Sequence, residues 1–487
     1  MKHTTKAVSL PTPVSDAAKA RNFLADNELV ESSRRLKLDA LASKAGFEKR
    51  SGHALAQVLF SFVIWPFLGQ RSLRMFCAES LCSFLKAGKD ALYDFLKRDD
   101  LPWRDLQHSV ALAVYCDGGY DEAAMSAFVA DDTVKQRRGK KMEGVSFHYD
   151  HLKGRSVRGQ QVTTLGHVSD KGFLPIDEQL YISSKGRQGL RNVAKDGRGI
   201  GAKRWRESFG SKIEQIIAML RRAVRKGFRA KYFVADSWYG CRDIIVACLS
   251  LHIVPVLRMK RGNQKYRYQG AWLNADELWA KHAHETLQKI PGLPYKAATI
   301  DLLMDISTDS KMPCLQPVRL LFVRGVDPDN KKKSWALFLT TDCDLEPAKT
   351  LEIYALRWGI EVYFKEVKQH MGMLKEQTMS FASHIASIHL AALRYLLLLE
   401  AVRYSGRLKF GEVRDAVGAD LRAQSYAALL WEVFRALIAG ALANLAQIIG
   451  AESISQALHA IDADVNDFLD HILQMDYPAL HAEDTVL

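Results

Sequence analysis

The tetrapeptide Phe-Val-Ala-Asp occurs twice in this chain, at residues 128–131 and again at residues 233–236. Each copy is an apolar run that ends in an acid, a pattern typical of a strand buried on both faces of a covered sheet. Open α/β sheets form their ligand sites at the carboxyl ends of such strands. We therefore expect Asp131 and Asp236 to lie at the functional edge of an α/β core. The alternative is that each Asp only starts a turn or caps a helix.

A third acid, Glu361, stands in a stretch that is predicted to be an amphipathic helix. Steps of four and seven residues return to nearly the same face of an α-helix. One stripe about 80° wide therefore carries a phenol, the carboxylate and cations, at Tyr354, Arg357, Glu361, Lys365 and Lys368. A neighbouring stripe is apolar and suits packing on a core, with Ile353, Leu356, Ile360, Phe364 and Val367. The alternative is a solvated helix face on which Glu-to-Lys spacing only supports the helix.

Three carboxylates from distant segments suit metal-assisted chemistry on a phosphodiester. Mg²⁺ prefers carboxylate and water oxygens, and two divalent ions about 3.5–4 Å apart can activate an attacking oxygen and stabilise a leaving one. Arg357 and Lys368 can hold phosphates near the scissile bond, the Arg through two parallel hydrogen bonds. Tyr354 can add a hydroxyl contact or stack on a base.

The spacing of the helical residues resembles that of a known family. Tyr354, Arg357, Glu361 and Lys368 match the Y-(2)-R-(3)-E-(6)-K signature of bacterial insertion-sequence DDE transposases of the IS-four type. The segment 131–133, Asp-Asp-Thr, resembles the first-acid motif of that family, and Asp236 in Val-Ala-Asp-Ser-Trp-Tyr-Gly resembles its second. The resemblance runs from about residue 81 to residue 373.

Only one of the adjacent acids Asp131 and Asp132 can point into the site from a strand. The Asp-x-Thr pattern and the shared tetrapeptide both favour Asp131, although the sequence leaves the choice open.

The resemblance implies a DNA transposase with a ribonuclease H-like core, in which the first and fourth strands lie side by side. It implies a magnesium cofactor, with Mn²⁺ as a substitute, held by Asp131 as the bridging ligand together with Asp236 and Glu361. It assigns DNA contacts to Tyr354, Arg357, Lys365 and Lys368. The implied partners are double-stranded DNA, as the terminal inverted repeats of the element and the target, and a second copy of the chain in a homodimer on DNA.

The predicted fold class is α/β, with a ribonuclease H-like catalytic core, a β-rich insertion and flanking helical regions. The expected domains are a helical DNA-binding region at 1–120, the first part of the core at 121–257, the β-rich insertion at 258–345, the catalytic helix at 346–375 and a helical C-terminal region at 376–487. Residues 71–97 suggest a helix-turn-helix around Gly88, a pattern that any helical hairpin shows. The apolar helix near 386–399 suits either self-association or a plain helical core.

Composition agrees with a DNA partner. The net charge of +13 and the pI near 9.2 favour a polyanionic partner. Basic clusters at 135–141, 185–206 and 221–226 suit phosphate tracking, or are simply solvated. Trp238 can stack on a flipped base, although a core position is the commoner role for Trp.

The resemblance implies a bacterial protein at the nucleoid, and the remaining features favour a cytoplasmic protein with no membrane partner. The seven cysteines lack a Cys-x-x-Cys pair, which favours reduced thiols and argues against zinc. The N-terminus has no apolar signal region, and the apolar stretch at 436–451 is too short to span a bilayer. Two other functions stay open: a transposase-derived DNA-binding protein without activity, and a ribonuclease H-like nuclease or resolvase without strand transfer.

Overall fold

The computed structural model describes residues 27–422 and a few single residues beyond them, with gaps at 49–51, 70–71, 82–83, 86, 140, 151–153, 184–196, 308–312, 326–334 and 406–408. The chain forms two compact units. The first unit is made of Met1–Asp39, Lys49–Lys89 and Leu397–Leu487, and the second of Ala40–Glu48 and Asp90–Leu396. The apolar stretch at 436–451 and most of the C-terminal region after residue 422 lie outside the described residues.

The described part of the first unit is helical. It contains α1 (Glu28–Arg35), α3 (Leu55–Ile64), η2 (Trp65–Leu68), α4 (Leu73–Glu79) and the last residues of α13 (Phe381–Ser405), followed by a helical segment at 410–422. Asn27 caps α1 by accepting from the Leu29 amide, and its own side-chain amide donates to the Val417 carbonyl at 3.4 Å. The cap thus ties the start of α1 to the distant 410–422 segment.

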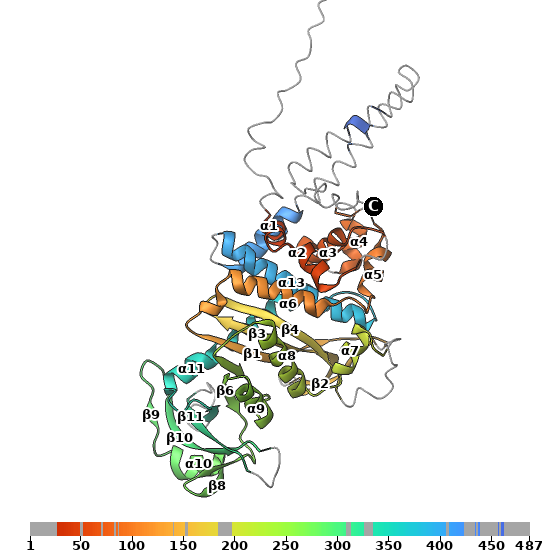
Figure 1. Ribbon diagram of the computed structural model, residues 1–487. Helices are drawn as coiled ribbons and strands as arrows, with labels where there is room; N and C mark the ends of the chain where they lie inside the picture. The colour runs from red at the N-terminus through yellow and green to blue at the C-terminus, as the bar shows by residue number, and fades with distance from the viewer. Residues whose placement is uncertain are drawn as a thin grey trace, which may run out of the picture. The chain divides into compact units, whose positions relative to one another are not determined.

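A large mixed sheet organises the second unit (Figure 1). Five neighbouring strands run in the order β4 (Gly172–Tyr181), β3 (Arg155–Ser169), β1 (Ser126–Gln136), β5 (Tyr232–Ala235) and β6 (Val254–Met259). The pairs β4–β3 and β3–β1 are antiparallel, whereas β1–β5 and β5–β6 are parallel. At the outer edge, β2 (Ser146–Asp150) pairs with β3.

Beyond β6 the same sheet continues into the segment predicted to be β-rich. Here β12 (Trp335–Thr340) pairs with β6, β11 (Leu315–Arg324) with β12, and β10 (Lys296–Asp305) with β11, all antiparallel. The shorter elements are β7 (Lys265–Tyr268), β8 (Ala271–Asn274), β9 (Gln288–Lys289), α10 (Ala275–Leu278) and η6 (Trp279–Ala283). The described residues of the segment 258–345 therefore contain several strands, as predicted for a β-rich insertion.

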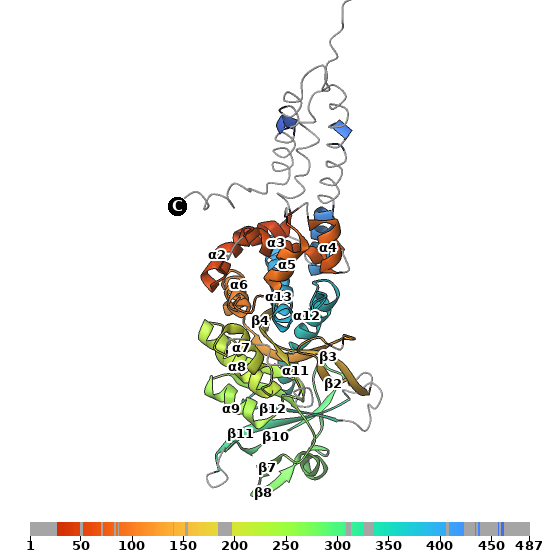
Figure 2. The ribbon, with the colours of Figure 1, turned by 90° about the vertical axis from the view of Figure 1, so that its right-hand side faces the viewer.

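Helices cover both faces of the first five strands (Figures 1 and 2). They are α6 (Trp103–Asp117), α7 (Ile200–Glu207), α8 (Lys212–Lys226), α9 (Arg242–Ser250), α11 (Pro347–Ala355), α12 (Trp358–Gln369) and α13, with α2 (Leu38–Ala45), α5 (Lys89–Leu96) and η4 (Tyr120–Glu122) nearby in the chain. Adjacent residues of β4 reach opposite faces: Asp177 pairs with α6 and α8, whereas Glu178 accepts from Tyr363 of α12. The α6 and α8 side and the α12 side are therefore distinct faces of one sheet.

Local sequence explains why α8 forms where it does. Ser211 and Glu214 make a reciprocal capping box, and Gly227 ends the helix with φ 108°, a conformation that glycine adopts without strain. Ile216, Met219 and other apolar residues at helical spacing are buried. The helix thus lies with one apolar face on the sheet and its basic residues outward.

Three local predictions need correction. We expected the first strand to end at Asp131, but β1 continues to Gln136 because β3 pairs with it along the whole length. The single catalytic helix is divided into α11 and α12. The basic stretch at 185–206 is not all loop, since α7 begins at residue 200; residues 184–196 lie outside the described part.

One helix in the described residues, within α13, is long and apolar enough to cross a membrane by length and composition alone. Of its most apolar window, 89% is buried inside the protein, as expected for the core helix of a folded domain. Most of the residues from 385 to 401 are buried in the structure.

Candidate active site

The two copies of the repeated tetrapeptide lie side by side. Strands β1 and β5 pair in parallel, with Phe128 opposite Phe233 and Ala130 opposite Ala235. The next residue on each strand is an acid, so Asp131 and Asp236 stand at the same level, where β5 ends. Burial, followed by the charges of Asp132 and Asp236, raises the pKa of Asp131 to about 7. The two carboxylates predicted to share a site therefore influence each other electrostatically.

Glu361 reaches the same place from α12 through an arginine. Arg357 donates from Nη1 to Asp131 Oδ2 at 3.1 Å, and from Nη2 to Glu361 Oε1. The guanidinium is only partly exposed; burial lowers its pKa, but the nearby Tyr354, Glu361 and Asp131 hold that pKa above the ordinary value. Residues 226 positions apart in the chain, Asp131 and Arg357, are thus in direct contact.

A tightened turn sets the position of Arg357. Between α11 and α12 the backbone stays helical, with φ −54° and ψ −26° at Arg357, but its amide donates to the Tyr354 carbonyl three residues earlier. The Leu356, Gly359 and Ile360 amides bond in the same three-residue pattern, which makes a short 3₁₀ segment. The predicted stripe survives this change, because Arg357 and Glu361 still pair at a spacing of four residues.

The apolar stripe holds α12 on the sheet. Ile360 and Val367 are fully buried and Phe364 nearly so, as predicted. Tyr363, which the stripe did not include, is also buried and donates to Glu178 Oε1 at 2.5 Å. This bond fixes α12 two residues after Glu361.

Asp132 points to the other face of the sheet, as the alternation of a strand requires. Its carboxylate accepts from Lys212 at 2.7 Å, from the Tyr239 hydroxyl at 2.9 Å and from the side chain of Gln161. The structure thus commits Asp132 to three partners of its own, while Asp131 faces α12.

Asp236 also starts a turn, as the alternative interpretation proposed. Its Oδ1 accepts from the Trp238 amide at 2.8 Å, an Asx turn that ends β5. Trp238 is 48% exposed, so the core position favoured for it is wrong. The ammonium groups of Lys212 and Lys260 lie 4.2 and 4.1 Å from its ring centroid. The exposed indole of Trp238 thus makes cation–π contacts with two lysines.

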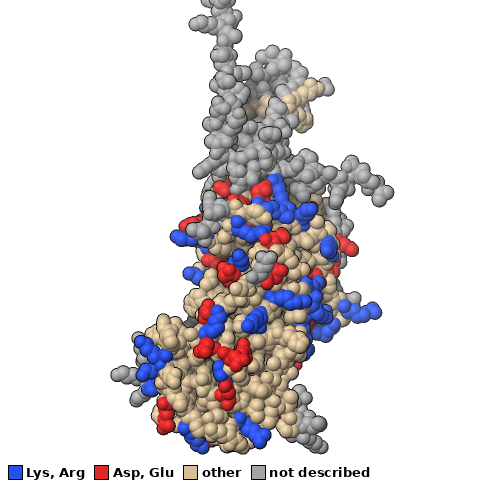
Figure 3. Space-filling model, turned by 60° about the vertical axis from the view of Figure 1, so that its left-hand side comes forward, with Lys and Arg blue, Asp and Glu red and all other residues tan. Residues whose placement is uncertain are grey.

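The remaining predicted contacts are spread along α11 and α12. Lys368 donates to Thr133 Oγ1 at 2.9 Å, and burial, then Lys135, lowers its pKa. Lys365 is exposed. The ring of Tyr354 packs edge-on against Phe338, with centroids 4.8 Å apart. Figure 3 shows one face on which acidic side chains gather with Lys and Arg close around them.

The carboxylates of Asp131, Asp236 and Glu361 are ligands that hard divalent cations prefer, but in the structure they do not form a metal-binding group. Among the residues that the structure describes, no three His, Cys, Asp or Glu side chains form a group that could hold a metal ion. Arg357 lies between Asp131 and Glu361, and one oxygen of Asp236 is turned to its own backbone. Carboxylate oxygens that lie beside like charges, as at Asp131, are the ligands that Mg²⁺ favours.

Sequence reasoning missed several residues of this region. Glu178 and Lys212 belong to no motif, and Glu178, Lys212 and Tyr239 each act through a partner far away in the chain. The only signal for Tyr239 was its place in the second-acid motif, three residues after Asp236.

Two family models match the chain. Residues 75–278 match the model described as DDE superfamily endonuclease, and residues 210–397 match the one described as Transposase DDE domain. The two ranges overlap and include all seven residues predicted for the site. No curated protein matches the chain.

Proposed function

We propose that this chain, whose residues 75–278 match the DDE superfamily endonuclease model and whose residues 210–397 match the Transposase DDE domain model, is a metal-dependent DNA transposase of the insertion-sequence type. It would bind the ends of its element, hydrolyse a phosphodiester and join the freed 3′-hydroxyl to target DNA. A homodimer on DNA, in the bacterial cytoplasm at the nucleoid, is part of the same proposal.

One observation carries the proposal: carboxylates from separate segments meet at one cation. Asp131 of β1 and Glu361 of α12 both bind the Arg357 guanidinium, and Asp236 stands in register beside Asp131. We propose that these three carboxylates are the metal ligands, with Asp131 rather than Asp132 in the first position. The three protein contacts of Asp132 support that choice.

We also propose a ribonuclease H-like core. Its support is the strand arrangement, in which three antiparallel strands are followed by two that run parallel to β1. The helix α8 precedes β5 and α9 precedes β6. In such a core the two acids meet because their strands are neighbours.

Divalent ions, Mg²⁺ or Mn²⁺, would activate the attacking oxygen and stabilise the leaving oxygen of an in-line displacement. The residues of the chain do the rest. Arg357 neutralises Asp131 and Glu361 while the DNA is absent, and its fork suits a phosphate equally well. Lys365 and Lys368 supply further cations along α12, and Tyr354 adds a hydroxyl near the end of α11. Trp238, with Lys212 and Lys260, offers a base-stacking surface flanked by phosphate-binding groups.

The match to a DDE superfamily endonuclease favours a second candidate, a nuclease of the same fold without strand transfer. A derived DNA-binding protein without activity is the third, and the acids argue against it.

The test uses the purified chain with duplex DNA that carries the sequences flanking its gene. The unmodified protein should nick this DNA in Mg²⁺, and Glu361→Gln should lower nicking at least about a thousandfold, which is roughly 4 kcal/mol of transition-state stabilisation. End binding should be nearly unchanged. Nicking by Glu361→Gln close to that of the unmodified protein would reject the assignment. Pre-cut ends that are never joined to target DNA would favour the nuclease.

A further inference from the structure

A second concentration of functional groups lies on the α6 and α8 face of the sheet, around a pocket of about 380 Å³ in the second unit. Its walls come from α6, α7 and α8, and none of the predicted catalytic residues lines it. The lining contains six cations and a single acid: Arg104, Lys203, Arg204, Arg222, Arg225 and Lys226 against Asp105. The pocket is therefore strongly basic.

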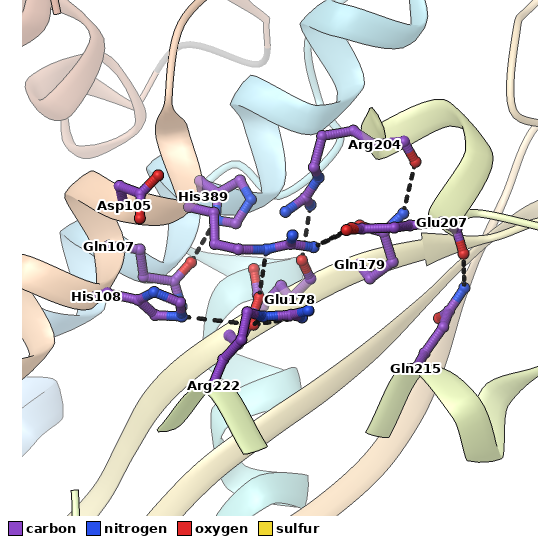
Figure 4. Close-up of polar contacts among 12 residues, drawn as sticks. Asp105, Gln107, His108, Glu178, Gln179, Arg204, Glu207, Gln215, Arg222 and His389 are labelled. Atoms are coloured by element: carbon purple, nitrogen blue, oxygen red, sulfur yellow. Dashed lines mark hydrogen bonds and ion pairs between the residues drawn. The ribbon is translucent and has the colours of Figure 1, made fainter. Parts of the chain in front are cut away.

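One buried carboxylate, Asp177, and one partly exposed carboxylate, Glu207, neutralise only part of this charge. Asp177 binds Arg104 at 3.0 Å and Arg222 at 2.7 Å, and Glu207 binds Arg104 at 2.8 Å. Figure 4 shows Arg204, Glu207 and Arg222 among the polar groups of this region. Although burial alone would raise it, Arg104 and Arg222 hold the pKa of Asp177 well below its usual value. Asp177 and Glu207 are thus paired with Arg104 and Arg222, and neither acid makes an ion pair with the other cations that line the pocket.

Arg204 lacks such a partner. Its side chain is buried, with a residue exposure of 4%, and Nη2 donates to the Glu178 carbonyl at 2.8 Å. Its Nε and Nη1 meet no hydrogen-bond acceptor among the described residues. Burying a guanidinium that makes no ion pair with a described carboxylate is costly, and burial, then Arg104, lowers its pKa well below the ordinary value in spite of the charges of Asp177 and Glu207.

The other unsatisfied groups at this pocket include a second donor. The indole Nε1 of Trp103, which also lines the pocket, is buried without an acceptor in the described part of the chain. At the mouth, Lys203 on α7 and Arg225 on α8 are exposed and pair with no described carboxylate, while Lys226 lies 3.4 Å from Asp105. The buried donors and the exposed cations would all be satisfied by an anionic ligand that accepts hydrogen bonds and donates none.

We propose that this pocket binds a phosphorylated ligand, with its phosphate oxygens held by Arg204 at the floor and by Lys203 and Arg225 at the mouth. Phosphate has several acceptor oxygens and no need to donate, and arginine forks match its geometry. The volume lies at the small end of the range for ligand pockets, which suits one phosphate group or a short phosphate chain. The ligand is either a free polyphosphate or a phosphate of the DNA backbone. The pocket involves neither a metal nor the catalytic carboxylates, so this inference stands or falls separately from the proposed function.

The test compares two double variants that remove the same charge from the same two helices. Lys203→Gln with Arg225→Gln removes the cations at the mouth. Arg206→Gln with Arg221→Gln removes exposed cations of α7 and α8 that do not line the pocket, and is the control. All four side chains are exposed, so both proteins should fold, and circular dichroism checks this.

Inorganic tripolyphosphate is titrated calorimetrically into each full-length protein at constant ionic strength. The pocket variant should bind it at least about tenfold more weakly than the control variant, because two charge-assisted hydrogen bonds are lost. If a short duplex binds equally to both variants, the ligand is a free phosphorylated molecule; if duplex binding weakens in parallel, it is the DNA backbone. The proposal is overturned if the unmodified protein does not bind tripolyphosphate, or if both variants bind it alike.

Discussion

Asp177 and Glu178 are adjacent on β4, and the sheet turns them to opposite faces with opposite results. Asp177 faces α6 and α8, where Arg104 and Arg222 bind it as an anion. Glu178 faces α12, where burial and then the charge of Asp177 raise its pKa to about 8, in spite of the Tyr363 hydrogen bond. At neutral pH one carboxyl is charged and its neighbour is largely protonated. The face that a side chain reaches, and the cations found there, decide its charge.

The same rule separates the two sites. Asp131, Thr164 and Glu178 stand opposite one another on β1, β3 and β4, so they share the α12 face. On that face Asp131 and Glu361 bind one guanidinium, and carboxylates brought together in this way suit a bound cation. The α6 and α8 face carries more cations than carboxylates and suits an anion.

The largest effect is expected when the charge of Asp177 is removed, because Asp177 is the ionised member of the two adjacent acids on β4. Asp177→Asn should lower the free energy of unfolding by about 3–5 kcal/mol, because it leaves two partly buried guanidinium groups without their shared counter-charge. Glu178→Gln, its matched control, should change stability by less than about 1.5 kcal/mol at pH 7, since it replaces a mostly neutral carboxyl with an amide that keeps an acceptor for Tyr363. Denaturant unfolding measures both. Equal losses in the two variants would show that the faces do not differ as described.

A second prediction concerns pH. The folded-state pKa of Glu178 is above its unfolded value, so the folded state binds one more proton between about pH 4.5 and about pH 8. This group therefore favours folding at low pH, and its contribution is lost as the pH rises through that window, by up to about 1.4 kcal/mol per unit. Between pH 5 and 8 the stability of the unmodified protein should fall more steeply than that of Glu178→Gln. Parallel curves would mean that Glu178 is ionised throughout.

The smallest expected effect sharpens the role of Arg357. Arg357→Ala should weaken binding to element-end DNA and reduce the slope of log affinity against log salt by about one, the loss of one phosphate contact. Fluorescence anisotropy over a series of salt concentrations measures this slope. An unchanged slope would limit Arg357 to its ion pairs with Asp131 and Glu361.

Patterns confined to one strand or one helix were predictable from the sequence. The repeated tetrapeptide predicted two buried strands, and they pair in register, residue for residue. The apolar stripe of α12 was predicted because burial follows helical spacing. The adjacency of β1 and β5 had been expected from the family resemblance, and the end of β1 moved because pairing with β3 extends this strand.

Features that depend on what covers a surface were not predictable. Nothing local distinguishes Asp177 from Glu178, or shows that Trp238 is exposed, until α6, α8 and α12 are in place. The position of Arg357 between two acids depends on the short 3₁₀ turn. None of the residue types in Leu356-Arg357-Trp358 predicts this turn. Similarly, α7 was not predicted because its segment is basic and rich in glycine. The pocket that α7 helps to line was therefore not predicted either.

The central claim is that Asp131, and not its neighbour Asp132, belongs to a divalent-cation site with Asp236 and Glu361. Mn²⁺ binding to the full-length protein, measured by electron paramagnetic resonance with and without DNA, tests it without relying on activity. Asp131→Asn should weaken Mn²⁺ binding at least about tenfold, a loss of roughly 1.4 kcal/mol or more, whereas Asp132→Asn should leave it within about threefold. Unchanged Mn²⁺ binding in Asp131→Asn, or a larger loss in Asp132→Asn, would contradict the account.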